Sequence, residues 1–183
     1  LAPDTYFVSR GDRRADVIAR MQERQRRILA AAWEERDASI AVESPEEALI
    51  LASIVEKETG VAEERPQVAS VFDNRLRIGM RLQSDPTVIY GITNGEGALG
   101  RGIRRSELDA RTPYNTYQID GLPPTPIANP GREAIMAVMN PAATPYYYFV
   151  ADGTGGHAFA ETLEEHNRNV ARWREIERTR SQN

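Results

Sequence analysis

Cysteine is absent from the 183-residue sequence, and only two histidines are present, His157 and His166. Without cysteine the chain cannot form disulfides, cysteine-based metal sites or a thiolate nucleophile, and this composition is compatible with an oxidising compartment. Two histidines alone do not make up a histidine-rich metal site. We therefore expect no metal ion and no other cofactor.

Long apolar runs are also missing. The sequence contains no stretch of eighteen apolar residues, which is about the length needed to span a bilayer. The formal net charge of −4 gives no overall positive field, which disfavours binding to nucleic acid. The composition, 40% hydrophobic and 27% charged, is typical of a globular domain with one sizeable core. The first residues, LAPDTYFV, look strand-like and lack a starting Met, so we expect a piece of a longer protein.

Apolar residues at helical spacing predict several helices, and a Gly-rich turn between aromatic stretches predicts a strand pair. The expected helices span residues 12–36, 45–58, 66–79, 130–139 and about 162–180, and the strand pair lies within residues 146–162. This pattern indicates an α+β fold with a small, largely antiparallel sheet. We expect one compact unit, in which residues 1–43 form an N-terminal strand and an amphipathic helix that lead into a main domain at residues 44–183.

Two further segments lie between the expected helices. In RLQSDPTVIYG we expect a short extended piece that enters a capped turn at Ser84, Asp85 and Pro86, followed by a flexible Gly-rich loop. Residues 112–130, TPYNTYQIDGLPPTPIANP, hold five prolines and predict ordered irregular backbone or a rim loop. Loops of this length in compact domains are often functional.

The stretch LASIVEKETG places a Glu-Lys-Glu triplet directly after an apolar run. Residues three and four apart share a helix face, which puts Glu56 on a stripe with Leu49, Ala52 and Ser53, while Glu58 lies below other apolar residues. A carboxyl group at Glu56 would be partly desolvated, which raises the pKa and suits a general acid. The alternative is an ordinary solvated helix end, and the pattern alone favours this alternative.

Several long motifs together resemble one known family. The segments LASIVEKET, VASVFDNRLRIGMRLQSDPTVIYG, TPYNTYQIDGLPPTPIANPG and YYYFVADGTGGHAFAETLEEHN are similar, in this order, to the YceG-like family of endolytic murein transglycosylases. The resemblance implies that this chain is the family's catalytic domain. It also implies a single-pass inner-membrane protein with this domain in the periplasm, in which a membrane anchor and a LysM-like domain precede the catalytic domain.

The resemblance implies a lyase with one catalytic glutamate, because Glu56 falls on the first glutamate of the family's VEKE motif. Glu56 would protonate the glycosidic oxygen between N-acetylmuramic acid and N-acetylglucosamine in peptidoglycan. The carboxylate would then take the proton of the muramoyl C6 hydroxyl, which closes a 1,6-anhydro ring. Cutting within glycan strands would end their elongation beside peptidoglycan synthases, the penicillin-binding proteins.

Seven further residues are candidates for substrate binding. They are Gln83, Ser84, Asp85, Tyr114, Asn115, Tyr117 and His157. Aromatic rings and an amide suit sugar faces and hydroxyls, although the same residues in TPYNTY would also serve as buried loop anchors. Asp85 has a helix cap as its alternative role, and His157 a structural one.

Two other functions remain open at this point. A glycoside hydrolase on the same polymer would use Asp85 to position a water molecule. A non-catalytic peptidoglycan-binding module would use Glu56 only as a helix end. The sequence does not indicate the preferred peptide stem, the oligomeric state, or whether Asp85 or His157 assists Glu56.

Overall fold

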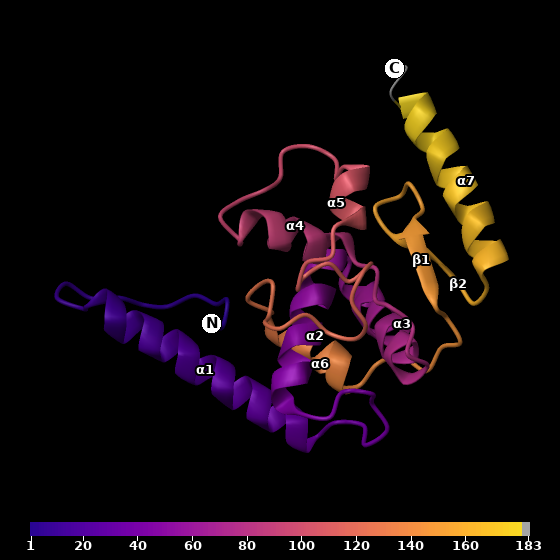
Figure 1. Ribbon diagram of the computed structural model, residues 1–183. Helices are drawn as coiled ribbons and strands as arrows, with labels where there is room; N and C mark the ends of the chain where they lie inside the picture. Colours follow the sequence, from indigo (N-terminus) through magenta and orange to yellow (C-terminus); the bar gives the residue numbers. More distant parts are fainter. Residues whose placement is uncertain (181–183) are drawn as a thin grey trace.

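Helix α2 lies at the centre of the fold, with the other elements arranged around it (Figure 1). The computed structural model describes residues 1–180. Its elements are α1 (Arg14–Glu34), α2 (Pro45–Glu58), the 3₁₀ helix η1 (Ala62–Glu64), α3 (Arg65–Arg77), α4 (Asp85–Thr93), α5 (Arg105–Asp109), α6 (Arg132–Met139), β1 (Tyr148–Ala151), β2 (His157–Ala160) and α7 (Leu163–Arg180). This arrangement confirms the α+β fold with a small antiparallel sheet.

Local signals and burial together explain helix α2. Ser44 Oγ accepts a hydrogen bond from the backbone N–H of Glu47 at 3.1 Å, and Pro45 occupies the first turn, as expected of an N-cap. The helix spans residues 45–58 as predicted. Its residues from Leu51 to Val55 are all buried, and the helix packs against α3 and α6 to form the core.

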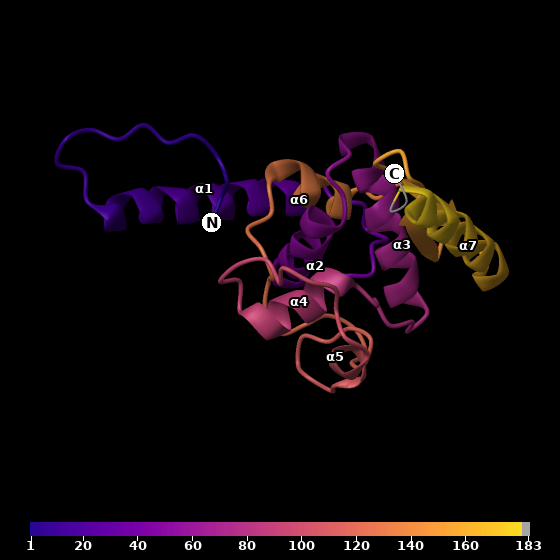
Figure 2. The ribbon, with the colours of Figure 1, turned by 90° about the horizontal axis from the view of Figure 1, so that it is seen from above.

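Helices α1 and α7 lie at opposite ends of the molecule in both views (Figures 1 and 2). The N-terminal residues run back along α1, where the Ala2 N–H donates to the Met21 carbonyl at 3.2 Å. They form no strand, so the expected N-terminal strand is wrong. The physical reason is that no neighbouring strand pairs with them, since β1 and β2 are the only strands among residues 1–180.

The predicted strand pair is confirmed as the antiparallel hairpin of β1 and β2, which pairs Tyr148 with Ala160 and Ala151 with His157. Helix α7 packs against both strands (Figure 1). The hairpin therefore holds His157 and the first turns of α7 beside the central helices. This placement matters because residues from both elements line the candidate site.

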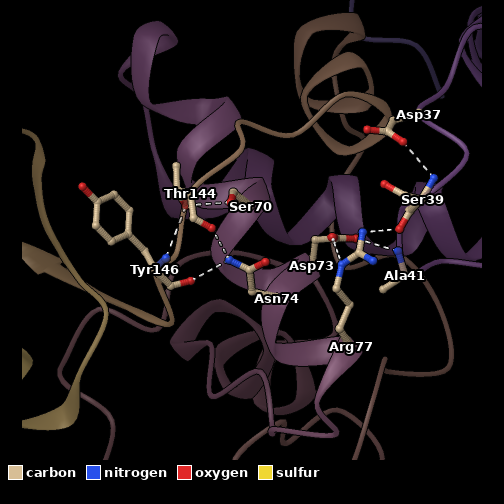
Figure 3. A network of polar contacts seen from close by, with 9 residues as sticks. All are labelled: Asp37, Ser39, Ala41, Ser70, Asp73, Asn74, Arg77, Thr144 and Tyr146. Atoms are coloured by element: carbon tan, nitrogen blue, oxygen red, sulfur yellow. Dashed lines mark hydrogen bonds and ion pairs between the residues drawn. The ribbon is translucent and has the colours of Figure 1, made fainter.

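A polar face of α3 fixes the two segments that flank it (Figure 3). Asn74 Nδ2 donates to the carbonyls of Thr144 and Tyr146 at 2.9 and 3.0 Å, on the approach to β1. On the other side, Asp73 accepts a hydrogen bond from the Ala41 N–H at 2.6 Å, just before α2. The half-buried amide of Asn74 and the buried carboxylate of Asp73 thus set the positions of the hairpin and of the segment that enters α2.

The segment after α3 differs from the expected capped turn, because residues 85–93 form the nine-residue helix α4, followed by the Gly-rich loop and the short helix α5. Residues 112–130 are irregular, as predicted. Among the described residues, no helix has both the length and the apolar character needed to cross a membrane.

Candidate active site

A cavity of about 340 Å³ lies where the C-terminal end of α2 meets α3, the start of α4, the hairpin and α7. Its polar lining comes from segments distant in sequence. These polar residues are Glu58, Arg75, Gln83, Asp85, Tyr117, His157 and His166. Residues 149–151 of β1 and Val170 of α7 supply the apolar walls. Four of the residues predicted from sequence, Gln83, Asp85, Tyr117 and His157, therefore meet in one cavity.

Glu58, the last residue of α2, is the most perturbed carboxyl group of this cavity. Burial raises the pKa of Glu58 to about 7, and the charge of Asp85 acts in the same direction. Ser84 Oγ donates a hydrogen bond to Glu58 Oε1 at 2.5 Å, which opposes the rise but does not cancel it. A carboxyl group with this pKa is partly protonated near neutral pH and can donate a proton.

Glu56 lies elsewhere, contrary to the expectation that it faces the groove. Its Oε2 accepts a hydrogen bond at 3.0 Å from the N–H of Gly131, the N-cap residue of α6, and Glu56 is not among the residues that line the cavity. Helix geometry explains why Glu56 and Glu58 face different ways. Positions i and i+2 point about 200° apart around an α-helix with 3.6 residues per turn. The stripe below Ile54 and Val55, which carries Glu58, is the one that reaches the cavity.

The loop before α4 is held by buried polar contacts to Thr116. Gln83 has a φ of +52°, in the left-handed region, and its N–H donates to the Thr116 carbonyl at 3.1 Å. The Ser84 N–H donates to Thr116 Oγ1 at 2.9 Å, and the hydroxyls of Thr116 and Thr87 lie 2.8 Å apart. These bonds keep Gln83 in a strained backbone conformation at the cavity wall and direct the Ser84 hydroxyl to Glu58.

Asp85 and Tyr117 both line the cavity and form a hydrogen-bonded pair. The Tyr117 hydroxyl donates to Asp85 Oδ1 at 2.6 Å. Burial and this hydrogen bond raise the pKa of Tyr117 above its ordinary value, so the phenol stays a proton donor to Asp85. Asp85 is thus both the first residue of α4 and a lining residue.

The two other candidates in the TPYNTY segment, Tyr114 and Asn115, make contacts within the protein. Asn115 is buried, and its Nδ2 donates to the carbonyls of Glu107, Leu108 and Ala110 at 2.7 to 3.1 Å. Its Oδ1 accepts from the Tyr117 N–H at 3.0 Å, which fixes Tyr117 over the cavity. Tyr114 packs against another tyrosine ring and does not line the cavity. Both were candidates for substrate contact. Asn115 is buried inside the loop, and the half-buried Tyr114 lies outside the lining of this cavity.

Sequence reasoning missed three charged or titratable residues of the cavity: Glu58, Arg75 and His166. Arg75 is buried and donates through Nε to the Tyr147 carbonyl at 2.6 Å and through Nη1 to the Leu82 carbonyl at 2.7 Å. It therefore joins α3 to the hairpin and to the loop of Gln83. Helical spacing on α3 offered a signal, because Arg75 comes three and four residues after the buried Phe72 and Val71 and therefore shares their face.

His166 reaches the cavity from the first turn of α7, where its ring stacks on Tyr148 with centroids 5.1 Å apart. Burial and the nearby charge of Arg75 lower the pKa of His166, so its neutral form is favoured. Its Nδ1 is buried without a hydrogen-bond partner among residues 1–180. His166 therefore contributes a flat, neutral ring to the cavity wall.

A larger hollow of about 670 Å³ follows α1 and is a poorer candidate for chemistry. Its only carboxylate, Glu23, accepts hydrogen bonds from Arg26 and Arg27, and these lower the pKa of Glu23. A carboxylate held ionised by arginines does not donate a proton near neutral pH.

The cavity at the end of α2 combines a partly protonated carboxyl group, a second carboxylate, a phenol and two imidazoles. This set suits acid and base catalysis. No cluster of three or more metal-ligating side chains occurs within residues 1–180, so the geometry identifies no metal centre in that part of the chain.

The chain is similar to proteins of one family. A sequence profile of the YceG-like family matches residues 1–172. The endolytic murein transglycosylase of Bacillus subtilis (strain 168) is 42% identical over 120 residues, which are 66% of this chain and 32% of that protein. The endolytic murein transglycosylase of Streptococcus pneumoniae serotype 2 (strain D39 / NCTC 7466) is 40% identical over 131 residues, 68% of this chain and 23% of the relative.

The fold has a counterpart among solved structures. A crystal structure described as a yceG-like protein from Listeria monocytogenes aligns with a TM-score of 0.73 at 36% identity, over 92% of this chain and 53% of that chain. The chain spans only 32% and 23% of the lengths of the two curated relatives. Because the family profile covers nearly all of its length, the chain belongs to the YceG-like family.

Proposed function

We propose that this chain is the catalytic domain of an endolytic peptidoglycan lytic transglycosylase in which Glu58 is the single catalytic acid and base. The names of the two curated relatives support the reaction and the polymer. The observation that carries the assignment of Glu58 is its position in the cavity, where burial raises its pKa to about 7. Glu56 has no such position, since its carboxylate binds the backbone at the start of α6.

The reaction proceeds in two proton transfers. Glu58 donates its proton to the glycosidic oxygen between N-acetylmuramic acid and N-acetylglucosamine, and the bond from that oxygen to the muramoyl C1 breaks. The muramoyl C6 hydroxyl oxygen then bonds to C1, and the ionised Glu58 takes the hydroxyl proton. The products are a free N-acetylglucosamine hydroxyl and a 1,6-anhydro muramoyl end, and Glu58 is protonated again.

Asp85 and Tyr117 support the charge that develops at C1. The transition state of glycosidic cleavage has positive character at this carbon, which a nearby carboxylate stabilises. The hydrogen bond of 2.6 Å from the Tyr117 hydroxyl fixes Asp85 Oδ1 for this task. Asp85 then needs no water molecule as its partner, because the nucleophile belongs to the substrate.

Two glutamine variants on the same helix test the assignment. Glu58→Gln keeps the shape but removes the acidic proton, so we expect loss of anhydro products from purified glycan strands. Glu56→Gln is the matched control two residues away, and we expect it to retain cleavage. The assignment of Glu58 is refuted if Glu58→Gln cleaves normally, and Glu56 replaces it if Glu56→Gln alone is inactive with its fold intact by circular dichroism.

A hydrolase is the second candidate, favoured by the presence of a second carboxylate, Asp85, in the same cavity. Mass spectrometry separates the two reactions, because a lytic product is lighter than the hydrolytic one by one water and lacks a reducing end. A third possibility, a non-catalytic binding module, predicts that strands bind and stay uncut at every pH.

The cellular setting is part of the same proposal. A domain that cuts nascent glycan strands would act outside the cytoplasm, held at the inner membrane by a segment that precedes this chain. There it would work beside peptidoglycan synthases such as penicillin-binding proteins and limit strand length. Fractionation of cells and crosslinking of the full-length protein would test the location and the partner.

A further inference from the structure

Glu64, at the end of η1, contacts His157 through both of its carboxylate oxygens. Oε1 accepts the backbone N–H of His157 at 2.9 Å, and Oε2 lies 2.8 Å from His157 Nδ1. The two side chains are 17% and 15% exposed, so water competes weakly for these bonds. The contact joins the turn after α2 to the first residue of β2, and it lies directly behind the cavity wall.

The contact requires a carboxylate and a small neighbour. An ionised carboxylate only accepts hydrogen bonds, so the proton is on Nδ1 and Nδ1–H donates to Glu64 Oε2. An amide in place of the Glu64 carboxylate would satisfy only one of the two donors of His157. A Cβ atom at Gly156 would collide with Glu64 Oε1, and the nearest other group is the carboxylate of Asp152. Glycine at this position therefore allows Glu64 to approach the hairpin closely.

The second ring nitrogen of His157 is open to the cavity. His157 lines the cavity, and no hydrogen bond within residues 1–180 involves Nε2. Nε2 is also not among the buried atoms of that region that lack a partner. A neutral imidazole with its proton on Nδ1 has a free lone pair on Nε2, which makes Nε2 an acceptor.

We propose that Glu64 is a positioning residue that holds His157 in the Nδ1–H tautomer, so that Nε2 accepts a hydrogen bond from a hydroxyl or amide N–H of the glycan beside Glu58. The nature of the donor rests on the proposed function, whereas the tautomer does not. A carboxylate behind a histidine sets the ring's tautomer and orientation in the same way in metal and catalytic sites. An ion pair that only ties η1 to the hairpin is the competing role.

Nitrogen NMR of histidine-labelled protein reads the tautomer directly, because the sequence has only two histidines. His157→Gln assigns the signals. At about pH 8 we expect His157 to carry its proton on Nδ1. Glu64→Gln should shift the ring toward the Nε2–H form, whereas Glu63→Gln, its exposed neighbour, should leave the spectrum unchanged. An Nε2–H or doubly protonated ring in the unaltered protein, or no response to Glu64→Gln, overturns the proposal.

A double-variant comparison then links the tautomer to the substrate. Loss of one well-placed hydrogen bond changes a binding constant by about tenfold, so Glu64→Gln should lower kcat/KM by about this factor. In the His157→Gln background the same change should have little further effect. Equal losses in both backgrounds would mean that Glu64 does not act through His157. Inactive unaltered protein would instead refute the proposed function and leave the NMR result standing.

Discussion

Replacing Glu58 by glutamine should change how the stability of the protein depends on pH. The carboxyl group of Glu58 has a pKa of about 7 in the folded protein, against an ordinary value of 4.5. Glutamine fills nearly the same volume but does not titrate. The difference in unfolding free energy between the two proteins therefore isolates the titration of this one group.

The sign follows from where the proton binds. Below pH 4.5 Glu58 is protonated in both the folded and the unfolded chain, and its titration costs no stability. As the pH rises from 4.5 to 7, the unfolded chain releases the proton while the folded protein retains it, so the unfolding free energy falls. At about 1.4 kcal/mol for each pH unit between the two pKa values, the loss reaches about 3 kcal/mol.

Urea denaturation followed by circular dichroism at about pH 4 and about pH 8 measures this effect. We expect Glu58→Gln to gain about 3 kcal/mol relative to the unaltered protein between the two conditions. Glu63→Gln removes the same charge from an exposed position and controls for net charge. Parallel pH dependence of the unaltered protein and Glu58→Gln would refute a buried, protonated Glu58.

Further substitutions test the groups around the cavity. Ser84→Ala removes the hydroxyl that lowers the pKa of Glu58, so the alkaline limb of the kcat/KM profile should move to higher pH; an unmoved limb contradicts the contact. Asn115→Asp loses the donors to three carbonyls and should lower the unfolding free energy by roughly 3 kcal/mol in urea titrations, and unchanged stability would refute the anchor. Arg75→Lys keeps the charge but not the fork that binds two segments, and should cost about 1 to 3 kcal/mol by the same assay; a neutral effect would mean that charge alone matters.

Helix α2 and the hairpin could be predicted because their determinants are local. Ser44 and Pro45 start the helix, and a continuous apolar run buries it. Helix α4 could not be predicted in the same way, because Gly91 weakens the helical pattern in sequence. The structure gives a reason for that glycine, since a Cβ there would lie 3.1 Å from the Cβ of Tyr114 in the loop that crosses α4.

The two glutamates of α2 show where prediction of the site from sequence stops. Helical spacing separates Glu56 from Glu58, but the partners that decide their roles come from distant parts of the chain. Gly131, which binds Glu56, is 75 residues away, and Ser84, which binds Glu58, is 26 residues away. Which face of a buried helix end meets a cavity is set by the packing of α6, α4 and the hairpin, and no local pattern encodes it.

The end of α2 also explains why a carboxyl group at Glu58 suits acid chemistry. The last turn of a helix carries the negative end of its dipole and therefore disfavours a second negative charge. Burial and the charge of Asp85 act in the same direction, and the Ser84 hydroxyl is the one hydrogen-bond donor to this carboxylate among residues 1–180. Because a single neutral donor offsets only part of the desolvation, the protonated form persists up to about neutral pH. Additional hydrogen-bond donors to this carboxylate would stabilise the protein, but they would also lower the pKa of Glu58 and so remove its acidic proton near neutral pH.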